Sequence, residues 1–329
     1  MKKISERQKL LVTDLIAEKG LNISEYALEK DYIVTDALQA LFKLEDPQFD
    51  FIFCGGTCFS KAYRLLDRIS EDVDIKVILK PGLNLSRSRL REALSQLKPK
   101  IISALVNAGF DEQDITKHAR DENKYLIFDA NYDTHFIKAD DMRSNMKLEL
   151  NFTTLALAPQ VLQIGLLFNE LADGKPYAFD TNCVDLREGL IEKLVSFPRR
   201  LAMYLHDPVR DLDKTLVRHL YDVHQTTKAH PGLLADIKPL QEILIDKLAQ
   251  DAREFSTQHP SFVSNPLGEL RNAMEFARTD PMISTMYKNF IRDMVYGQIP
   301  PSFEESINSF NANLENLLPK AGINFTKVN

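Results

Sequence analysis

The chain has 329 residues, which is enough for roughly two packed units at about 100 to 200 residues per domain. Hydrophobic residues make up 44% and charged residues 27% of the chain, and these globular values exclude a disordered or fibrous protein. The formal net charge of −6 argues against a globally basic nucleic-acid binder but allows a local basic patch.

The cysteine content and the N-terminal sequence predict a cellular location. The chain carries Cys54, Cys58 and Cys183, an odd and sparse set that fits free thiols in a reducing compartment. The N-terminus lacks the apolar core of a secretion signal, and no run of roughly 18 apolar residues follows. We therefore expect a soluble, cytoplasmic protein that neither is exported nor enters a membrane.

The first part of the chain predicts two helices, a strand, a glycine turn and a third helix. Residues 4–44 follow a helical pattern that breaks at Gly20. Residues 51–53 are apolar and predict a short buried strand that runs into a Gly-Gly turn, and a helix is expected from Thr57 to Arg68.

Apolar and polar residues alternate in the next strands. In residues 72–79 the apolar side chains take one face, and Asp72 and Asp74 share the other. Strands are also expected near residues 124–132 and 146–152, the second again alternating. A sheet with two neighbouring acids on one face follows from this pattern.

The remaining pattern is helical. A polar helix is expected around residues 87–108, and strand signals largely disappear after residue 186. The predicted fold class is mixed α/β (α+β): a small twisted sheet flanked by helices, followed by a mainly helical C-terminal lobe. We expect N-terminal helices over residues 1–48, a core over residues 49–185 and a helical domain over residues 186–329.

The glycine turn has the residue types of a phosphate site. Gly55 and Gly56 let backbone N–H groups approach phosphate oxygens, and the helix expected from Thr57 offers its positive end, with Lys61 about one turn inside it. An ordinary structural turn is the alternative interpretation.

The paired acids have the residue types of a metal site. Asp72 and Asp74 can point side by side, and two like charges at that spacing need a cation such as Mg²⁺ to stay ionised. A solvated strand face is the alternative. Glu149 is the candidate for a third carboxylate, opposite the apolar side of its strand. Its alternative is an edge-strand acid paired with Lys147 or another surface charge.

The order of these segments resembles a known family. In chain order the segments are E-K-D-Y from Glu29, G-G-T from Gly55 with Lys61, R-I-S-E-D-V-D from Arg68, K-L-E-L-N-F around Glu149, E-K-L around Lys193, R-H-L-Y-D-V from Arg218 and M-V-Y-G-Q-I-P-P-S-F-E-E from Met294. They resemble the AbiEii/AbiGii-type nucleotidyltransferase toxins of the DNA polymerase beta-like superfamily, which includes the MenT toxins. The resemblance covers nearly the whole chain.

The resemblance implies a site and a reaction. It implies a two-metal-type site for Mg²⁺ or Mn²⁺ at Asp72 and Asp74, assisted by Glu149, which moves a nucleoside monophosphate from an NTP to an acceptor and releases pyrophosphate. It also implies roles for the residues Gly55, Gly56, Thr57, Lys61 and Ser70 in NTP binding, Lys193 in reaching the triphosphate, and Asp222 in orienting groups across the cleft. Without that context, Lys193 would be interpreted as a helix lysine whose ammonium extends to solvent. Asp222 would be interpreted as an acid that pairs with a side chain one turn away on its helix.

The function implied by the resemblance is that of a toxin with a cognate antitoxin, acting on the 3′ end of tRNA. Nucleotide transfer onto a protein uses the same metals, and a non-catalytic NTP-binding module would use the same acids. Six basic side chains could line an RNA-facing cleft or merely a solvated helix face: Lys98, Lys100, Arg199, Arg200, Arg210 and Arg218.

Overall fold

The structure, a computed structural model, describes residues 1–138, 142–172, 174 and 179–319. The chain divides into two compact units: the first comprises Met1–Asp185 with Met294–Gly297, and the second comprises Leu186–Asp293 with the rest of the C-terminal segment. The short stretch Met294–Gly297 thus groups with the first unit, although it lies far along the predicted helical domain. The three-part division by sequence stays a prediction.

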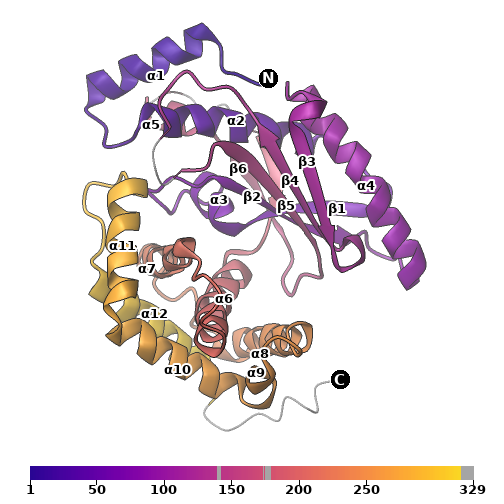
Figure 1. Ribbon diagram of the computed structural model, residues 1–329, viewed down its shortest axis with the longest axis vertical. Coiled ribbons are helices and arrows are strands. Elements are labelled where there is room, and N and C mark those ends of the chain that lie inside the picture. The colour runs from indigo at the N-terminus through magenta and orange to yellow at the C-terminus, as the bar shows by residue number, and fades with distance from the viewer. Residues whose placement is uncertain (139–141, 173, 175–178, 320–329) are drawn as a thin grey trace. The chain divides into compact units, whose positions relative to one another are not determined.

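A seven-stranded mixed sheet forms the first unit, in the order β3-β4-β5-β2-β1-β7-β6 (Figure 1). The β5–β2 and β1–β7 pairs are parallel, and the other neighbouring strands pair antiparallel. The strands are β1 Phe49–Cys54, β2 Asp72–Leu79, β3 Ile115–Arg120, β4 Tyr125–Asn131, β5 Asn145–Phe152, β6 Gln160–Ile164 and β7 Phe179–Cys183.

Side-chain oxygens begin the long helices of the first unit. Ser5 caps the first helix in a capping box with Gln8, and Gly20 ends it in the left-handed conformation. Ser24 and Ser86 cap the next two long helices. The helices are α1 Glu6–Lys19, α2 Glu25–Phe42, α3 Gly55–Lys61, α4 Arg87–Asn107 and α5 Leu167–Leu171, with short 3₁₀ turns at Glu112–Asp114 and Asp121–Asn123.

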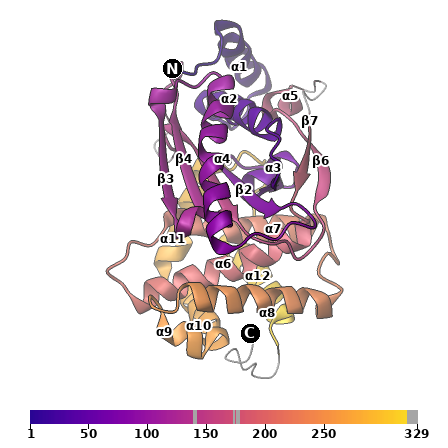
Figure 2. The same cartoon turned by 90° about the vertical axis from the view of Figure 1, so that its right-hand side faces the viewer.

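One face of the sheet carries the core of this unit. Figures 1 and 2 show α2 and α4 running beside each other over the sheet. The apolar residues that alternate along β2 and β5 are buried, as are the inward residues of α4: Val73, Ile75, Val77, Leu148, Leu150, Leu94, Leu97 and Ile101. Their burial fixes the strand register, because a slip by one residue would send this whole set to the opposite face.

In the part of the second unit that the structure describes, helices joined by loops form the regular secondary structure. Apolar side chains of α6, among them Leu190, Leu194 and Leu201, are buried, and the Phe197 ring packs on Phe310 with centroids 5.2 Å apart. Pro198 lies within α6. The helices are α6 Leu186–His206, α7 Arg218–Ala229, α8 Ile237–Glu254, α9 Pro260–Ser264, α10 Pro266–Thr279, α11 Pro281–Met294 and α12 Phe303–Leu317, with a 3₁₀ turn at Lys214–Val217.

The predicted fold class, a mixed sheet flanked by helices and followed by a mainly helical part, is confirmed. The helix predicted for residues 57–68 is wrong in its bounds, because α3 begins at Gly55 and ends at Lys61. Arg64 then takes a positive φ of 55°, and Arg68 forms a β-bridge with Val295, so residues after Lys61 leave the helix. Across the described residues, no helix is long and apolar enough to cross a membrane.

Candidate active site

The pairing of β2 with β5 sets the three predicted carboxylates on one face of the sheet. Asp74 is the direct register partner of Glu149, and Asp72 is the partner of Lys147. Register partners on parallel strands point to the same side of a sheet, and residues two apart on one strand do so as well. The backbone therefore brings Asp72, Asp74 and Glu149 together, opposite the buried core face.

The glycine turn lies directly against one of these acids. Cys54, the last residue of β1, pairs with Asp74, and α3 begins at the next residue. Gly55 has a φ of +74°, and a Cβ added there would overlap the carboxylate of Asp74. Position 55 therefore requires glycine for two reasons: its positive φ and its close contact with the Asp74 carboxylate. The two sequence motifs meet at this point.

Hydroxyl groups join the turn to the segment before β2. The Thr57 hydroxyl donates to the carbonyl oxygen of Asp72, and its oxygen lies 2.6 Å from the Ser70 oxygen. A Cβ at Gly56 would overlap the guanidinium of Arg68. The predicted NTP-binding residues Gly55, Gly56, Thr57 and Ser70 thus form one cluster beside Asp72 and Asp74.

Lys61 is close to this cluster but has partners of its own. Its ammonium lies 2.5 Å from Asp31 Oδ1 and donates to the carbonyl oxygen of Gly165 at 3.3 Å, with 6% of the side chain exposed. Thr57, Lys61 and Ser70 line a cavity of about 20 Å³, the size of one water molecule. In this structure Asp31, which the sequence reasoning assigned no role, holds the lysine.

Two neighbours hold the side chain of Glu149. Lys147 forms an ion pair with one carboxylate oxygen, and the Tyr125 hydroxyl donates to the other. Burial, and then this hydrogen bond, raise the pKa of Tyr125 well above its ordinary value. Consistent with this engagement of Glu149, no group of three or more His, Cys, Asp or Glu among the described side chains is arranged to hold a metal ion.

Glu149 therefore combines features of both sequence interpretations. It pairs with Lys147, as the alternative interpretation has it, but β5 lies between β4 and β2 and is not an edge strand. Its backbone position, in register with Asp74, places it on the same sheet face as the two aspartates. A carboxylate oxygen set of this kind suits a hard cation such as Mg²⁺, and Glu149 could join the set only by exchanging its ion pair with Lys147 for the cation.

Lys193 and Asp222 form an ion pair inside the second unit. The Lys193 ammonium lies 2.8 Å from Asp222 Oδ2, and the two side chains are 6% and 1% exposed. Lys193 comes from α6 and Asp222 from α7, which pack against each other. The structure thus joins these two predicted residues to each other, and it joins the glycine turn to the carboxylates within the first unit.

The family of the chain is shown by its sequence. A family model described as nucleotidyl transferase AbiEii toxin, type IV TA system, matches residues 36–309. The chain belongs to this family. The resemblance stated from the motifs is confirmed. A search of the curated proteins finds no match.

Among solved structures, this AbiEii-family chain is similar to MenT4, a nucleotidyltransferase toxin from Mycobacterium tuberculosis H37Rv, with 17% sequence identity and a TM-score of 0.42. The match covers 69% of this chain and 66% of the MenT4 chain. The chain therefore spans slightly less than two thirds of that protein.

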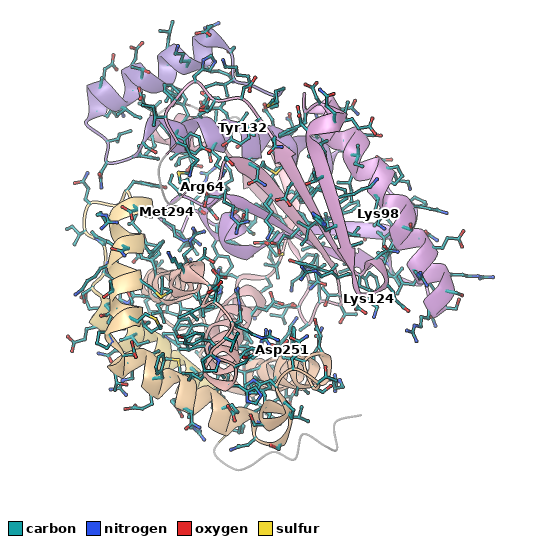
Figure 3. The ribbon with its side chains drawn as sticks, viewed as in Figure 1. Arg64, Lys98, Lys124, Tyr132, Asp251 and Met294 are labelled. Carbon is teal, nitrogen blue, oxygen red and sulfur yellow. The ribbon has the colours of Figure 1, made fainter. Side chains whose placement is uncertain are left out.

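Most of the basic side chains suggested for RNA have partners within the AbiEii-family chain. Arg199 lies 2.9 Å from Asp251, which Figure 3 labels, and Arg200 and Arg210 also pair with aspartates. Lys98, on α4 in the same figure, donates to Asn123, and Lys100 pairs with Asp46 at 2.6 Å. Each of these five basic side chains already has a polar or acidic partner within its own unit.

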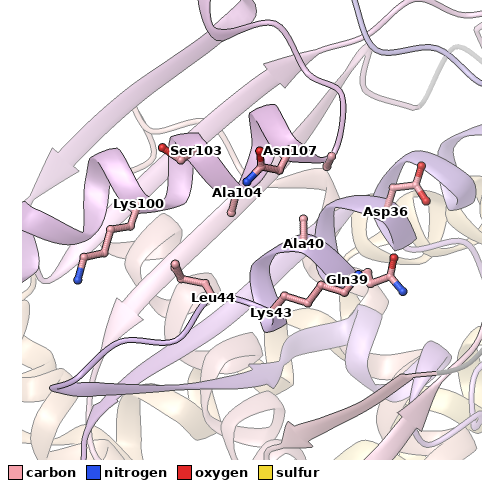
Figure 4. Close-up of a pocket in the computed structure, with 10 residues that line it drawn as sticks. Asp36, Gln39, Ala40, Lys43, Leu44, Lys100, Ser103, Ala104 and Asn107 are labelled. Carbon is pink, nitrogen blue, oxygen red and sulfur yellow. The ribbon is translucent and has the colours of Figure 1, made fainter.

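A larger hollow of the first unit lies away from the predicted site. It has a volume of about 560 Å³ and lies between α2 and α4, as Figure 4 shows. Its lining includes Asp36, Gln39, Lys43, Lys100, Ser103 and Asn107. None of the residues predicted to bind NTP or metal lines it, so the carboxylate face remains the candidate site of this AbiEii-family chain.

Sequence reasoning missed three residues that contact the predicted site. Tyr125 holds Glu149, Asp31 holds Lys61, and the Arg143 guanidinium lies 3.7 Å from Asp72. Asp31 stands in the E-K-D-Y segment, which was noticed only as part of the family resemblance. Tyr125 and Arg143 lie outside every motif, and only the fold brings them close to Glu149 and Asp72.

Proposed function

We propose that this protein is a Mg²⁺-dependent nucleotidyltransferase toxin that acts in the cytoplasm and is restrained by a cognate antitoxin. It moves a nucleoside monophosphate from an NTP to an RNA acceptor, the 3′ end of a tRNA, and releases pyrophosphate. One observation carries the proposal: the glycine turn meets Asp74 at the end of β1, beside Asp72 and in register with Glu149. The family match supports the toxin role and the antitoxin partner.

The metal would be held by Asp72 and Asp74, with Glu149 as the third ligand. These are hard oxygen donors on one sheet face, as Mg²⁺ or Mn²⁺ prefers. The chemistry that a cation would supply there is neutralisation of phosphate oxygens and activation of the acceptor hydroxyl. Glu149 would leave Lys147 to join the set, and Tyr125 would keep its carboxylate oriented.

The triphosphate would lie over the glycine turn. Backbone N–H groups of Gly55, Gly56 and Thr57 and the hydroxyl of Ser70 would donate to its oxygens. Lys61 would exchange Asp31 for a phosphate, and Lys193 would reach the triphosphate while Asp222 orients that lysine. Transfer of this kind needs positioning and charge neutralisation rather than covalent help from the protein, which fits the residue types present.

A non-catalytic NTP-binding module is the second candidate. The observation that favours it is the engagement of Glu149 by Lys147 and Tyr125, together with that of Lys61 by Asp31. If these partners were never released, the acids could hold a metal-bound NTP without turnover. Transfer onto a protein would use the same groups and differs only in the acceptor.

The test is transfer of label from NTP to RNA. Purified protein is incubated with total small RNA, Mg²⁺ and each labelled NTP in turn, and RNA and protein bands are resolved on gels. Asp74→Asn is run beside it, with Asp50→Asn on β1 as the control, because Asp50 pairs with Lys80 outside the site. Label on RNA that Asp74→Asn abolishes and Asp50→Asn retains is the expected result.

Other outcomes separate the candidates. Label on protein bands would replace the RNA acceptor with a protein. Binding of NTP without label on any acceptor would favour the non-catalytic module. Chelation of the divalent cation before the assay is expected to remove the label, and Mn²⁺ is expected to restore it.

A further inference from the structure

Three side chains hold the backbone of Arg143, immediately before β5. The Glu71 carboxylate accepts from the Arg143 N–H at 2.6 Å, and the Lys30 ammonium and Tyr26 hydroxyl both donate to the Arg143 carbonyl oxygen at 2.7 Å. Tyr132, labelled in Figure 3, donates to the Tyr26 hydroxyl at 3.0 Å. Both polar groups of one loop residue are therefore fixed from the interior of the first unit.

The centre of this arrangement is a buried ion pair. Lys30 Nζ lies 2.9 Å from Glu71 Oε1, and the two side chains are 1% and 2% exposed. Burial lowers the pKa of Lys30, and the Glu71 charge opposes that shift. A buried ion pair adds little stability compared with an apolar pair of similar size, so we look for a geometric role of this pair. Both partners contact the backbone of Arg143, which indicates that the pair holds this loop residue in place.

The side chain of Arg143 reaches the candidate site. Its Nη1 lies 3.7 Å from Asp72 Oδ1, and 39% of the side chain is exposed, so a ligand can approach the guanidinium from solvent. Glu71 is the residue between Ser70 and Asp72 in the chain, so the same short segment carries the site and the support of Arg143. A planar guanidinium with several N–H donors matches phosphate oxygens.

We propose that Lys30 and Glu71 position Arg143 beside Asp72, and that Arg143 binds an oxygen of a polyphosphate. The ligand is the triphosphate of the substrate or the pyrophosphate that leaves, since both present the same oxygens. This inference rests on the proposed function, because it takes Asp72 to be at the site of an NTP.

The charges of the site agree with this role. A cation held by Asp72 and Asp74 would stand close to a second cation, the guanidinium of Arg143. Two positive groups at such a spacing repel each other unless an anion lies between them. A polyphosphate that contacts both satisfies them, and Arg143 would then exchange its contact with Asp72 for a phosphate oxygen.

The experiment measures polyphosphate binding directly. Pyrophosphate, and each of the four ribonucleoside triphosphates, is titrated calorimetrically into the full chain at saturating Mg²⁺ without an acceptor. Arg143→Gln is expected to weaken binding by about 10- to 100-fold, the value of a charge-assisted contact, and Arg143→Lys to recover part of it. Arg87→Gln serves as the control, because it removes an arginine paired with Glu122 elsewhere in the first unit. Titration with the triphosphates measures binding of the substrate, and titration with pyrophosphate measures binding of the product.

A second variant tests the support of Arg143. Lys30→Met combined with Glu71→Leu removes both buried charges and keeps Arg143. It is expected to weaken pyrophosphate binding as much as Arg143→Gln does, with no further loss when all three changes are combined. Thermal unfolding reports whether this variant folds, and Arg143→Gln carries the test alone if it does not.

Three results would overturn the inference. If Arg143→Gln binds pyrophosphate and NTP as the unaltered protein does, the proposed function stands and the role of Arg143 is wrong. A change in Mn²⁺ affinity alone, with polyphosphate binding unchanged at saturating metal, would likewise mean that Arg143 only supports Asp72. If the unaltered protein binds neither ligand, the proposed function fails together with the inference.

Discussion

The two charged clusters of this chain differ in their access to water. Asp72 and Glu149 in the first unit are 25% and 21% exposed, and their present partners are cationic or phenolic side chains. Lys193 and Asp222 in the second unit are 6% and 1% exposed and contact each other at 2.8 Å. An exposed carboxylate can exchange a lysine for a metal ion at little cost, whereas separating a buried pair leaves an uncompensated charge.

This difference suggests that the two charged clusters have different roles. The sheet face of the first unit is organised by backbone register, so its carboxylates stay together even when their partners change. In the second unit the side chains themselves hold α6 and α7 in one arrangement. Substitutions in the first cluster should therefore affect chemistry with little change in stability, whereas those in the second should lower stability whatever their effect on transfer.

The largest effect is expected at Asp74. Asp74→Asn keeps the size of the side chain but removes a charge that the proposed metal site needs, so label transfer should fall by about 10³-fold or more. The midpoint of denaturant unfolding should stay close to that of the unaltered protein. A stability loss as large as the activity loss would mean that the two clusters do not differ as proposed.

Removal of the Lys193–Asp222 pair tests the expected effect of the second cluster on stability. Lys193→Met alone should lower the free energy of unfolding by about 3–5 kcal/mol, because Asp222 is left charged and buried. Lys193→Met with Asp222→Leu should restore much of that loss in urea unfolding. If the double variant is stable and inactive, the proposed contact of Lys193 with the triphosphate gains support, and recovery of activity would assign the pair a structural role only.

A smaller effect is expected at the glycine turn, for which the chain supplies a matched control. Gly55 and Gly82 have φ of +74° and +82°, but an added Cβ meets Asp74 only at Gly55 and nothing within 4 Å at Gly82. Both changes to alanine should cost about 1–2 kcal/mol of backbone strain. Only Gly55→Ala should also lower transfer by about 10²-fold, because it displaces Asp74. Equal activities in the two variants would contradict the close approach.

The smallest expected effect is on the pH dependence of unfolding, and it is caused by Asp251 in the second unit. Burial raises the pKa of Asp251 to about 6, although Arg199 acts to lower it. The folded state therefore binds the proton more tightly than the unfolded chain, and the free energy of unfolding should fall as pH rises from about 4 to 6. Asp251→Asn should remove up to about 2 kcal/mol of that fall in thermal unfolding, since the side chain is a quarter exposed. The exposed Asp246 on the same helix provides the control variant, and equal pH profiles would refute the assignment.

The sequence predicted the elements with strong apolar periodicity. Alternation along residues 72–79 placed β2 at its observed bounds, and the same pattern located β5. Three strands were missed, namely β3, β6 and β7. Strands β3 and β6 lack such alternation, and the buried positions of β7 are Thr181 and Cys183, which are not large apolar residues. Five of the six residues of β3 are exposed, so no apolar face marked it as a strand.

Sequence reasoning also found part of the candidate site. Placing Asp72 and Asp74 on one face needed only the two-residue period of a strand. The pairing of Asp74 with Glu149 and the approach of Gly55 depend on which strands are neighbours, and one sequence carries no direct signal of that. The partners of Glu149 and Lys61 come from distant segments and could be seen only in the fold.

The link between Arg68 and Val295 bears on how this protein is made. Ile69 donates to the carbonyl oxygen of Met294 at 2.8 Å, and Tyr296 donates to that of Asp67 at 3.0 Å. The segment that leads into Ser70 and Asp72 therefore lacks these backbone partners until translation has passed residue 296. Because a ribosome adds residues from the N-terminus, a nascent or prematurely ended chain carries all three carboxylates but an incompletely supported site. The candidate site of a protein with this topology therefore gains these backbone contacts only after residue 296 has been synthesised.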